Sequence, residues 1–121
     1  MDPIGTVNGL VIDGADTLGL ATFWAELFAT TVASNENDGH YIDLHPTNDG
    51  LTLRFQRVPE AKTVKNRLHL DVEVPDVEAA VARVEELGGS VVARPDPEYG
   101  YRFVVVADPE GNEFCVIRRI D

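Results

Sequence analysis

Apolar residues recur at helical spacing in a stretch that follows Asp16. They lie three or four residues apart and therefore share one face of a helix: Leu20, Phe23, Trp24, Leu27 and Phe28. Asp16 is a suitable N-cap, because its carboxylate can accept a hydrogen bond from a backbone N–H of the first turn. The pattern predicts a helix that begins after Asp16 and buries its aromatic face.

A second stretch has clearer boundaries. Pro75 and Asp76 open it, Glu78 lies in the first turn where the helix dipole favours an anion, and Gly88 and Gly89 end it. Its apolar stripe consists of Val77, Ala80, Val81, Val84 and Leu87. The pattern predicts a second amphipathic helix between Asp76 and Gly88.

Most of the remaining apolar residues lie in short runs separated by turn-forming segments, as is typical of β-strands. The turns are rich in Asn, Asp, Gly and Pro, for example over residues 48–50, 95–97 and 108–112. We predict strands at residues 10–13, 31–33, 40–44, 51–57, 68–74, 91–94, 101–107 and 113–120.

The same order of elements occurs twice: a strand, an Asp-capped helix and three strands. Asp16 and Asp76 lie 60 residues apart, and the turn glycines Gly50 and Gly111 lie 61 apart. We therefore predict an α+β fold with two βαβββ modules, residues 1–58 and 68–121, joined by a linker at 59–67. A module of this size folds only marginally alone, so we expect a single domain over residues 1–121.

Alternation along the strands predicts which side chains face the helices. In the strand at 68–74, Leu68 and the other even-numbered residues are apolar and should face a helix, whereas His69, Asp71 and Glu73 should face away. The same rule leaves polar side chains on the opposite face of the other strands. We therefore predict a curved mixed sheet with a concave cleft, lined by candidate ligand-binding residues Arg54, Gln56, His69, Asp71, Glu113 and Cys115.

Composition limits the classes of partner. The 121 residues include 21 Asp and Glu but only 10 Lys and Arg, a formal net charge of −11. Such a chain repels nucleic acid and anionic membranes, and we predict neither as a partner. The single cysteine, Cys115, excludes an intramolecular disulfide and a multi-cysteine zinc site. The sequence shows neither signal-peptide features nor an apolar run long enough to span a membrane, so we predict a cytoplasmic protein.

These motifs together resemble the vicinal oxygen chelate superfamily, which includes glyoxalase I, bleomycin-resistance proteins, fosfomycin-resistance enzymes and extradiol dioxygenases. The resemblance covers nearly the whole chain. It rests on Asp16 followed by Phe23-Trp24, on residues 66–71 (NRLHLD), on the helix from Asp76 to Gly88-Gly89, and on residues 108–112 (DPEGN) before the last strand. It implies the paired-module fold and a homodimer that binds a small molecule.

Metal-dependent members of this superfamily place one ligand on each of four strands. The matching positions here are Gly9, Arg54 (or Gln56, two residues further along), His69 and Cys115. Glycine has no donor side chain, and a guanidinium repels a divalent cation. We therefore predict that the usual metal site is absent and that the chain has no cofactor. A divalent metal ion stays possible if Glu113 replaces Cys115 as a ligand beside His69 and Gln56, with water at the remaining position.

Several functions stay open at this point. The first is small-molecule binding of the glyoxalase/bleomycin-resistance type, with the acidic face favouring a cationic ligand. The alternative is a metal-dependent lyase, isomerase or dioxygenase with an altered ligand set. A third hypothesis is metal-free acid–base chemistry with His69 as the best catalytic candidate, and a fourth is an accessory dimer without catalysis. The sequence leaves open whether the chain is an enzyme.

Overall fold

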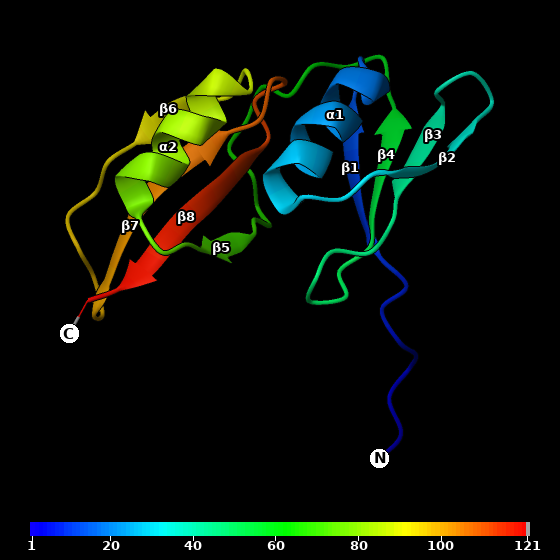
Figure 1. Cartoon of the computed structure of the whole chain (residues 1–121). Helices are drawn as coiled ribbons and strands as arrows, with labels where there is room; N and C mark the ends of the chain where they lie inside the picture. The colour runs from blue at the N-terminus through cyan, green and yellow to red at the C-terminus, as the bar shows by residue number, and fades with distance from the viewer. Residues whose placement is uncertain (121) are drawn as a thin grey trace. The chain divides into compact units, whose positions relative to one another are not determined.

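The computed structural model describes residues 1–120, and the chain divides into two compact units, residues 1–60 (unit 1) and the residues from 61 onward (unit 2). Unit 1 contains β1 (Leu10–Gly14), α1 (Thr17–Phe28), β2 (Val32–Glu36), β3 (Tyr41–Leu44) and β4 (Leu53–Arg57) (Figure 1). Unit 2 contains β5 (Asp71–Glu73), α2 (Val77–Glu86), β6 (Ser90–Ala93), β7 (Tyr101–Ala107) and β8 (Glu113–Arg119). Neither helix is long and apolar enough to cross a membrane within the described chain.

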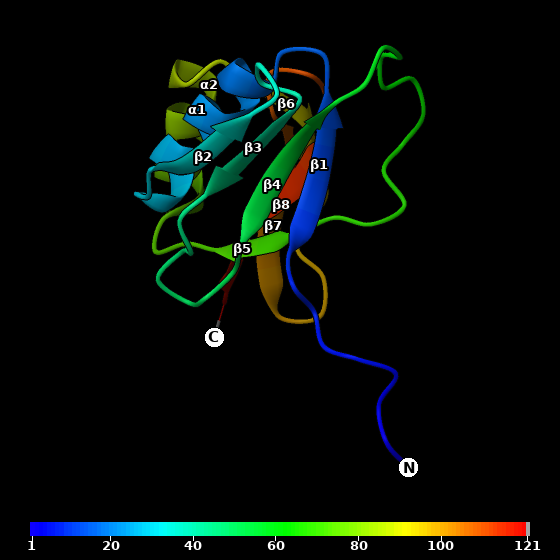
Figure 2. The same ribbon diagram turned by 90° about the vertical axis from the view of Figure 1, so that its right-hand side faces the viewer.

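Each unit has a four-stranded mixed sheet of the same topology. The strand order is β1-β4-β3-β2 in unit 1, as Figure 2 shows, and β5-β8-β7-β6 in unit 2. The first and last strands of each unit pair in parallel, and the other neighbours are antiparallel. The predicted α+β class with two βαβββ arrangements is confirmed.

The repeat extends to individual hydrogen bonds at the start of each helix. The Asp16 carboxylate accepts from Gly19 N at 3.0 Å, and the Asp76 carboxylate accepts from Ala79 N at 3.1 Å. Both contacts satisfy an N–H that has no partner within the helix. Both predicted caps are confirmed.

The turn before the last strand of each unit is also repeated. In unit 2, Asp108 Oδ1 accepts from Asn112 N at 3.0 Å, and in unit 1 the hydroxyl of Thr47 accepts from Leu51 N at the same distance. Both residues are buried, and the N–H of a turn glycine donates to the backbone carbonyl of each. The two turns therefore have one geometry, built from a carboxylate in unit 2 and a hydroxyl in unit 1.

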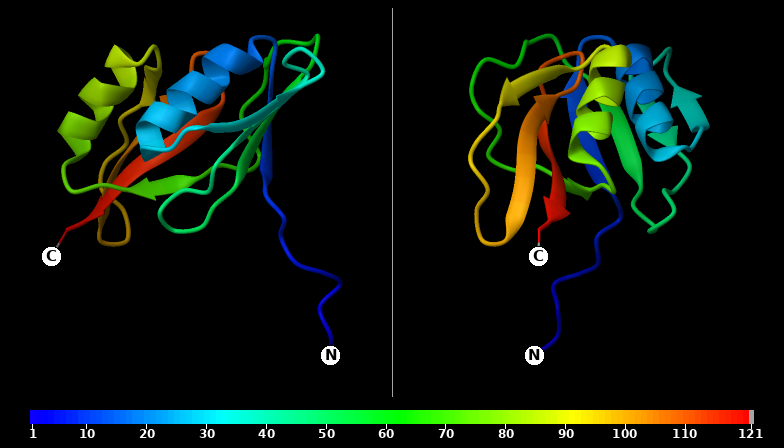
Figure 3. Two further views of the ribbon diagram at one scale, coloured as in Figure 1. Left: turned by 45° about the vertical axis from the view of Figure 1, so that its right-hand side comes forward. Right: turned by 60° about the vertical axis from the view of Figure 1, so that its left-hand side comes forward.

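Each helix covers one face of its own sheet, as Figure 3 shows. The predicted helical stripes supply much of the core, because Leu20, Phe23 and Trp24 of α1 and Val81 and Val84 of α2 are at most 2% exposed. The helix-facing positions of the strands complete it: Ile42, Leu53, Phe55, Val104, Val106, Phe114 and Val116. The opposite face of each sheet carries both polar and apolar side chains, among them Val11 in unit 1 and Val105 and Ile117 in unit 2.

The strand predicted at 68–74 is the least accurate of the eight. Only Asp71–Glu73 forms β5, and Leu68 is 83% exposed rather than packed beneath a helix. The Leu68 carbonyl accepts from the side chain of Asn66 instead of a strand partner, so the chain reaches the sheet only at Leu70. The alternation of apolar and polar residues correctly predicts a strand from Asp71 to Glu73. Its prediction that Leu68 packs beneath a helix is wrong.

Candidate functional site

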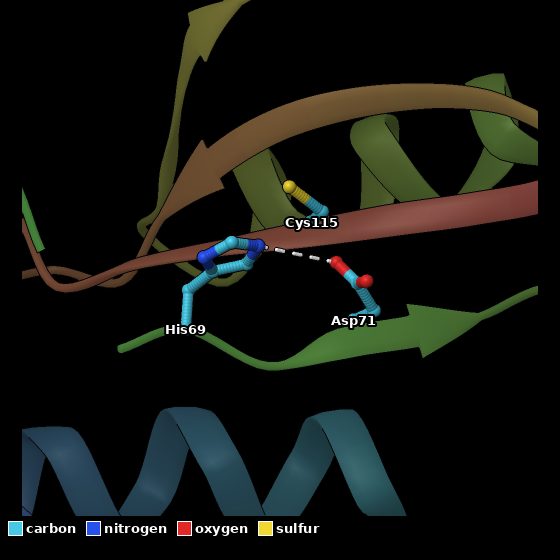
Figure 4. Close-up of side chains that lie close together, drawn as sticks. All are labelled: His69, Asp71 and Cys115. Atoms are coloured by element: carbon cyan, nitrogen blue, oxygen red, sulfur yellow. Dashed lines mark ion pairs between the residues drawn. The ribbon is translucent and has the colours of Figure 1, made fainter. Parts of the chain in front are cut away.

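The parallel pair β5–β8 brings two candidate residues together. Asp71 lies opposite Cys115 in the register of the two strands, on the face that points away from α2. His69 precedes β5 by two residues, and Figure 4 shows its imidazole beside the Asp71 carboxylate and near the Cys115 thiol. These three residues form a cluster contained entirely in unit 2.

The cluster is tight. His69 Nε2 lies 3.3 Å from Asp71 Oδ1, and the donor atoms of His69, Asp71 and Cys115 all lie within 4.8 Å of one another. The side chains of His69 and Asp71 are about half exposed, whereas Cys115 is buried. The arrangement offers one nitrogen, one oxygen and one sulfur donor at the surface of the sheet.

The surroundings of Cys115 keep its thiol protonated. Burial raises the pKa of the thiol most, and the negative charge of Asp71 and a hydrogen bond to it raise the pKa further. Lys65 acts in the opposite direction. Because the thiolate is the reactive form, the raised pKa argues against Cys115 as a nucleophile at neutral pH.

Glu113 contacts two lysines rather than the residues of the cluster. Its carboxylate lies 2.7 Å from Lys65 Nζ and 3.5 Å from Lys62 Nζ, and its side chain is only 11% exposed. The hydrogen bond from Lys65 lowers the pKa of Glu113 and outweighs the effect of burial, so the group is ionised and already paired. The structure does not bring Glu113 into the cluster of His69, Asp71 and Cys115.

Arg54 and Gln56 lie in unit 1 on β4. Arg54 forms a two-point ion pair with Asp43 on β3, at 2.6 and 2.9 Å, and its guanidinium lies 5.8 Å from the Tyr41 ring centre. This pairing lowers the pKa of Asp43 and raises the pKa of Arg54. Gln56 is half-buried, opposite Asp13 and Tyr41 in the strand register.

Asp43, the ion-pair partner of the candidate residue Arg54, is not among the candidates predicted from the sequence. The signal was available in the hairpin, because the turn around residues 48–50 joins β3 to β4 and places Asp43 directly opposite Arg54. Opposite charges at facing positions of antiparallel strands attract. The pair neutralises the one cation among the predicted site residues.

The repeat allows the two units to be compared position by position. In unit 1, Val11 lies opposite Arg54 as Asp71 lies opposite Cys115 in unit 2. Gly9 matches His69, and a Cβ at Gly9 would lie 3.0 Å from the Thr52 carbonyl oxygen. None of the three matching residues of unit 1, Gly9, Val11 and Arg54, has a side chain that can bind a metal ion. The backbone at Gly9 is also packed too tightly for a larger side chain to fit without a shift.

Residues 9–117, most of the chain, match the family described as the glyoxalase-like domain. The chain belongs to the glyoxalase-like family. No curated protein sequence matches this glyoxalase-like chain.

Solved structures share the fold at low sequence identity. A glyoxalase/bleomycin resistance protein/dioxygenase from Nocardioides is 14% identical, with a TM-score of 0.76 over 100% of this chain and 87% of the other. The fosfomycin resistance protein FosX from Listeria monocytogenes is 13% identical, with a TM-score of 0.75 over 94% and 91%. A bleomycin-binding protein complexed with bleomycin is 15% identical, with a TM-score of 0.65 over 95% and 99%.

These neighbours include proteins with and without a named metal. A FosX variant was solved with Mn(II) and 1S,2S-dihydroxypropylphosphonic acid, whereas the bleomycin-binding protein was solved with bleomycin. At such identities the likeness establishes the fold alone. The choice between the two kinds of site depends on the donor set of this chain.

Proposed function

We propose that this glyoxalase-like chain binds a small organic molecule on a sheet face that points away from its helix, without the four-ligand metal centre. The observation that carries the proposal is the donor set. Two of the four matched positions are Gly9 and Arg54, one without a side chain and one a cation already paired with Asp43. Two donors at His69 and Cys115 are too few for that centre, whatever ion is offered.

The charges favour a cationic ligand. Two of the charged candidates are neutralised by neighbours, because Asp43 pairs with Arg54 and two lysines pair with Glu113. Asp71 and Glu73 stay exposed on the face of β5 that points away from α2. With a net charge of −11, the chain should attract a cation over long range, and added salt should weaken that attraction.

Bleomycin is a direct probe of this proposal. We expect calorimetric titration to show binding that weakens on the order of tenfold between 50 and 300 mM NaCl. The Asp71→Asn and Glu73→Gln variants should bind more weakly than the wild-type chain. The matched control is Glu85→Gln, which removes the same charge from α2 on the other side of the sheet.

Three results would contradict a cationic ligand of this type: no heat of binding, affinity independent of salt, or an equal loss in the Glu85→Gln variant. Native mass spectrometry of untreated protein would then identify any other molecule that copurifies. Such a molecule would support small-molecule binding by this chain but would replace the cationic ligand with one of another class.

The cluster of His69, Asp71 and Cys115 favours a second candidate, a metal-dependent lyase, isomerase or dioxygenase with an altered ligand set. Nitrogen, oxygen and sulfur donors within 4.8 Å of one another suit a borderline ion such as Zn²⁺ or Co²⁺. Binding would displace the thiol proton, so affinity should rise with pH. Titration with Co²⁺ should then give a thiolate charge-transfer band that Cys115→Ser abolishes; without that band, this candidate fails.

A homodimer and a cytoplasmic location belong to the same proposal. Support for the dimer comes from the superfamily resemblance, and analytical ultracentrifugation would measure it directly. Support for the location comes from the sequence, whose charge also disfavours nucleic acid and membranes as partners.

A further inference from the structure

Residues 62–68, called the strap below, form neither helix nor strand but are bound to the start of β8. Lys65 Nζ lies 2.7 Å from Glu113 Oε1, and Lys62 Nζ lies 3.5 Å from Glu113 Oε2. The backbone N–H of Glu113 donates to Asn66 Oδ1 at 3.2 Å. A single residue of β8 therefore holds three residues of the strap.

Apolar burial contributes little to holding the strap. Its apolar side chains, Val64 and Leu68, are 74% and 83% exposed. The Glu113 side chain beneath is only 11% exposed, so its charge is partly shielded from water and interacts more strongly with the lysines than a surface group would. The polar contacts of Glu113 are thus the main attachment of this segment.

The strap leads directly into the cluster. Asn66 Nδ2 donates to the Leu68 carbonyl at 3.2 Å, and Cys115 N donates to the Leu70 carbonyl at 2.9 Å. The carbonyls of both residues that flank His69 are therefore fixed. This placement brings the imidazole to the position seen in Figure 4, beside Asp71 and the buried thiol.

We propose that Glu113 is a positioning residue, which holds the strap closed so that His69 lies against Asp71 and Cys115. Release of the strap from Glu113 moves His69 away from the cluster and exposes the buried Cys115 thiol to molecules from solution. The inference rests on the proposed function only in taking this cluster as part of the ligand site. It assigns Glu113 a role different from that of a metal ligand or a ligand contact.

Two sets of variants of the full chain test this role. Glu113→Gln removes the charge but keeps the backbone N–H that binds Asn66, and Lys62→Gln with Lys65→Gln removes the opposite partners. We expect both to raise amide hydrogen exchange over residues 62–70 about tenfold, with exchange in β7 unchanged. Both should also speed alkylation of Cys115 by iodoacetamide. Glu113→Asp keeps the charge, so its alkylation rate should lie between those of the wild-type chain and Glu113→Gln.

Alkylation separates strap opening from a direct effect of charge on the thiol. Removing Glu113 favours the thiolate, whereas removing Lys65 disfavours it, so charge alone predicts opposite changes in the two variants. Strap opening predicts an increase in both, and combining all three substitutions should add no further exchange. Glu85→Gln is the control, because that exposed carboxylate lies on α2.

Opposite changes in alkylation, unchanged exchange in the strap, or equal increases in the strap and β7 would each overturn the proposal. The measurements use no ligand, so they can fail while bleomycin binding succeeds. The converse is also possible, which keeps the two proposals independently testable.

Discussion

Replacement of Asp108 by Ala should lower the free energy of unfolding by about 3 kcal/mol. Asp108 is 2% exposed, and its carboxylate accepts from Glu110 N, Asn112 N and Asn112 Nδ2 at 2.9 to 3.0 Å. The substitution leaves these donors without that acceptor in a part-buried turn that leads into β8. Urea denaturation followed by far-ultraviolet circular dichroism measures the loss.

The repeat supplies a matched control for this change. Thr47 holds the equivalent turn of unit 1 with a neutral hydroxyl that accepts from Leu51 N. Its hydroxyl also donates to the carboxylate of Asp49, but that residue is exposed and can bond to water instead. Thr47→Ala should therefore cost less, about 1 kcal/mol, because the one part-buried donor it leaves unpaired is Leu51 N. Equal losses in the two variants, or a loss below 1 kcal/mol for Asp108→Ala, would show that the carboxylate does not stabilise the turn beyond a neutral acceptor.

The same turns and caps show which features can be predicted from sequence. Asp16, Asp76 and Asp108 act on residues two to four positions away, so a short window of sequence contains both donor and acceptor. The apolar stripes are equally local, because helical periodicity decides which face is buried. The order of elements, both caps and the repeat follow from such short-range signals.

Other features could not be predicted, either because the usual local signal is missing or because the contacting residues lie far apart in the sequence. The end of α1 has no glycine: Ala29 adopts a left-handed conformation at the C-cap, with φ of 53°. The lysines of Glu113 lie 48 and 51 residues away in sequence. Their pairing with Glu113 requires the path of the strap, which alternation did not predict.

The candidate site shows the same division. Alternation alone places Asp71 and Cys115 on the polar faces of their strands. That they lie opposite one another follows only from the register of the parallel pair, which no hairpin turn sets. The sequence therefore predicts the residues of the cluster but not that Asp71 raises the pKa of the thiol.

Asp71→Asn should lower the pKa of Cys115 and raise the thiolate fraction at a pH below its midpoint. Asp71 raises the pKa of Cys115 by its negative charge and by a hydrogen bond, and both favour the protonated thiol. Removing the charge favours the thiolate, so the titration moves toward lower pH. The chain has one cysteine, so thiolate absorbance reports this group once the tyrosine background of a Cys115→Ser variant is subtracted.

Two further variants assign the effect to the charge of Asp71. Asp71→Glu keeps the charge beside the thiol, so its titration should stay closer to that of the wild-type chain. Glu73→Gln removes an equal charge from the same strand, but Glu73 lies opposite Ile117 rather than Cys115 and should leave the thiol unchanged. Equal downward movement in Asp71→Asn and Glu73→Gln would mean that overall charge, rather than this contact, controls the thiol. An unchanged titration in Asp71→Asn would mean that burial and the charge of Glu113, rather than Asp71, raise the pKa of Cys115.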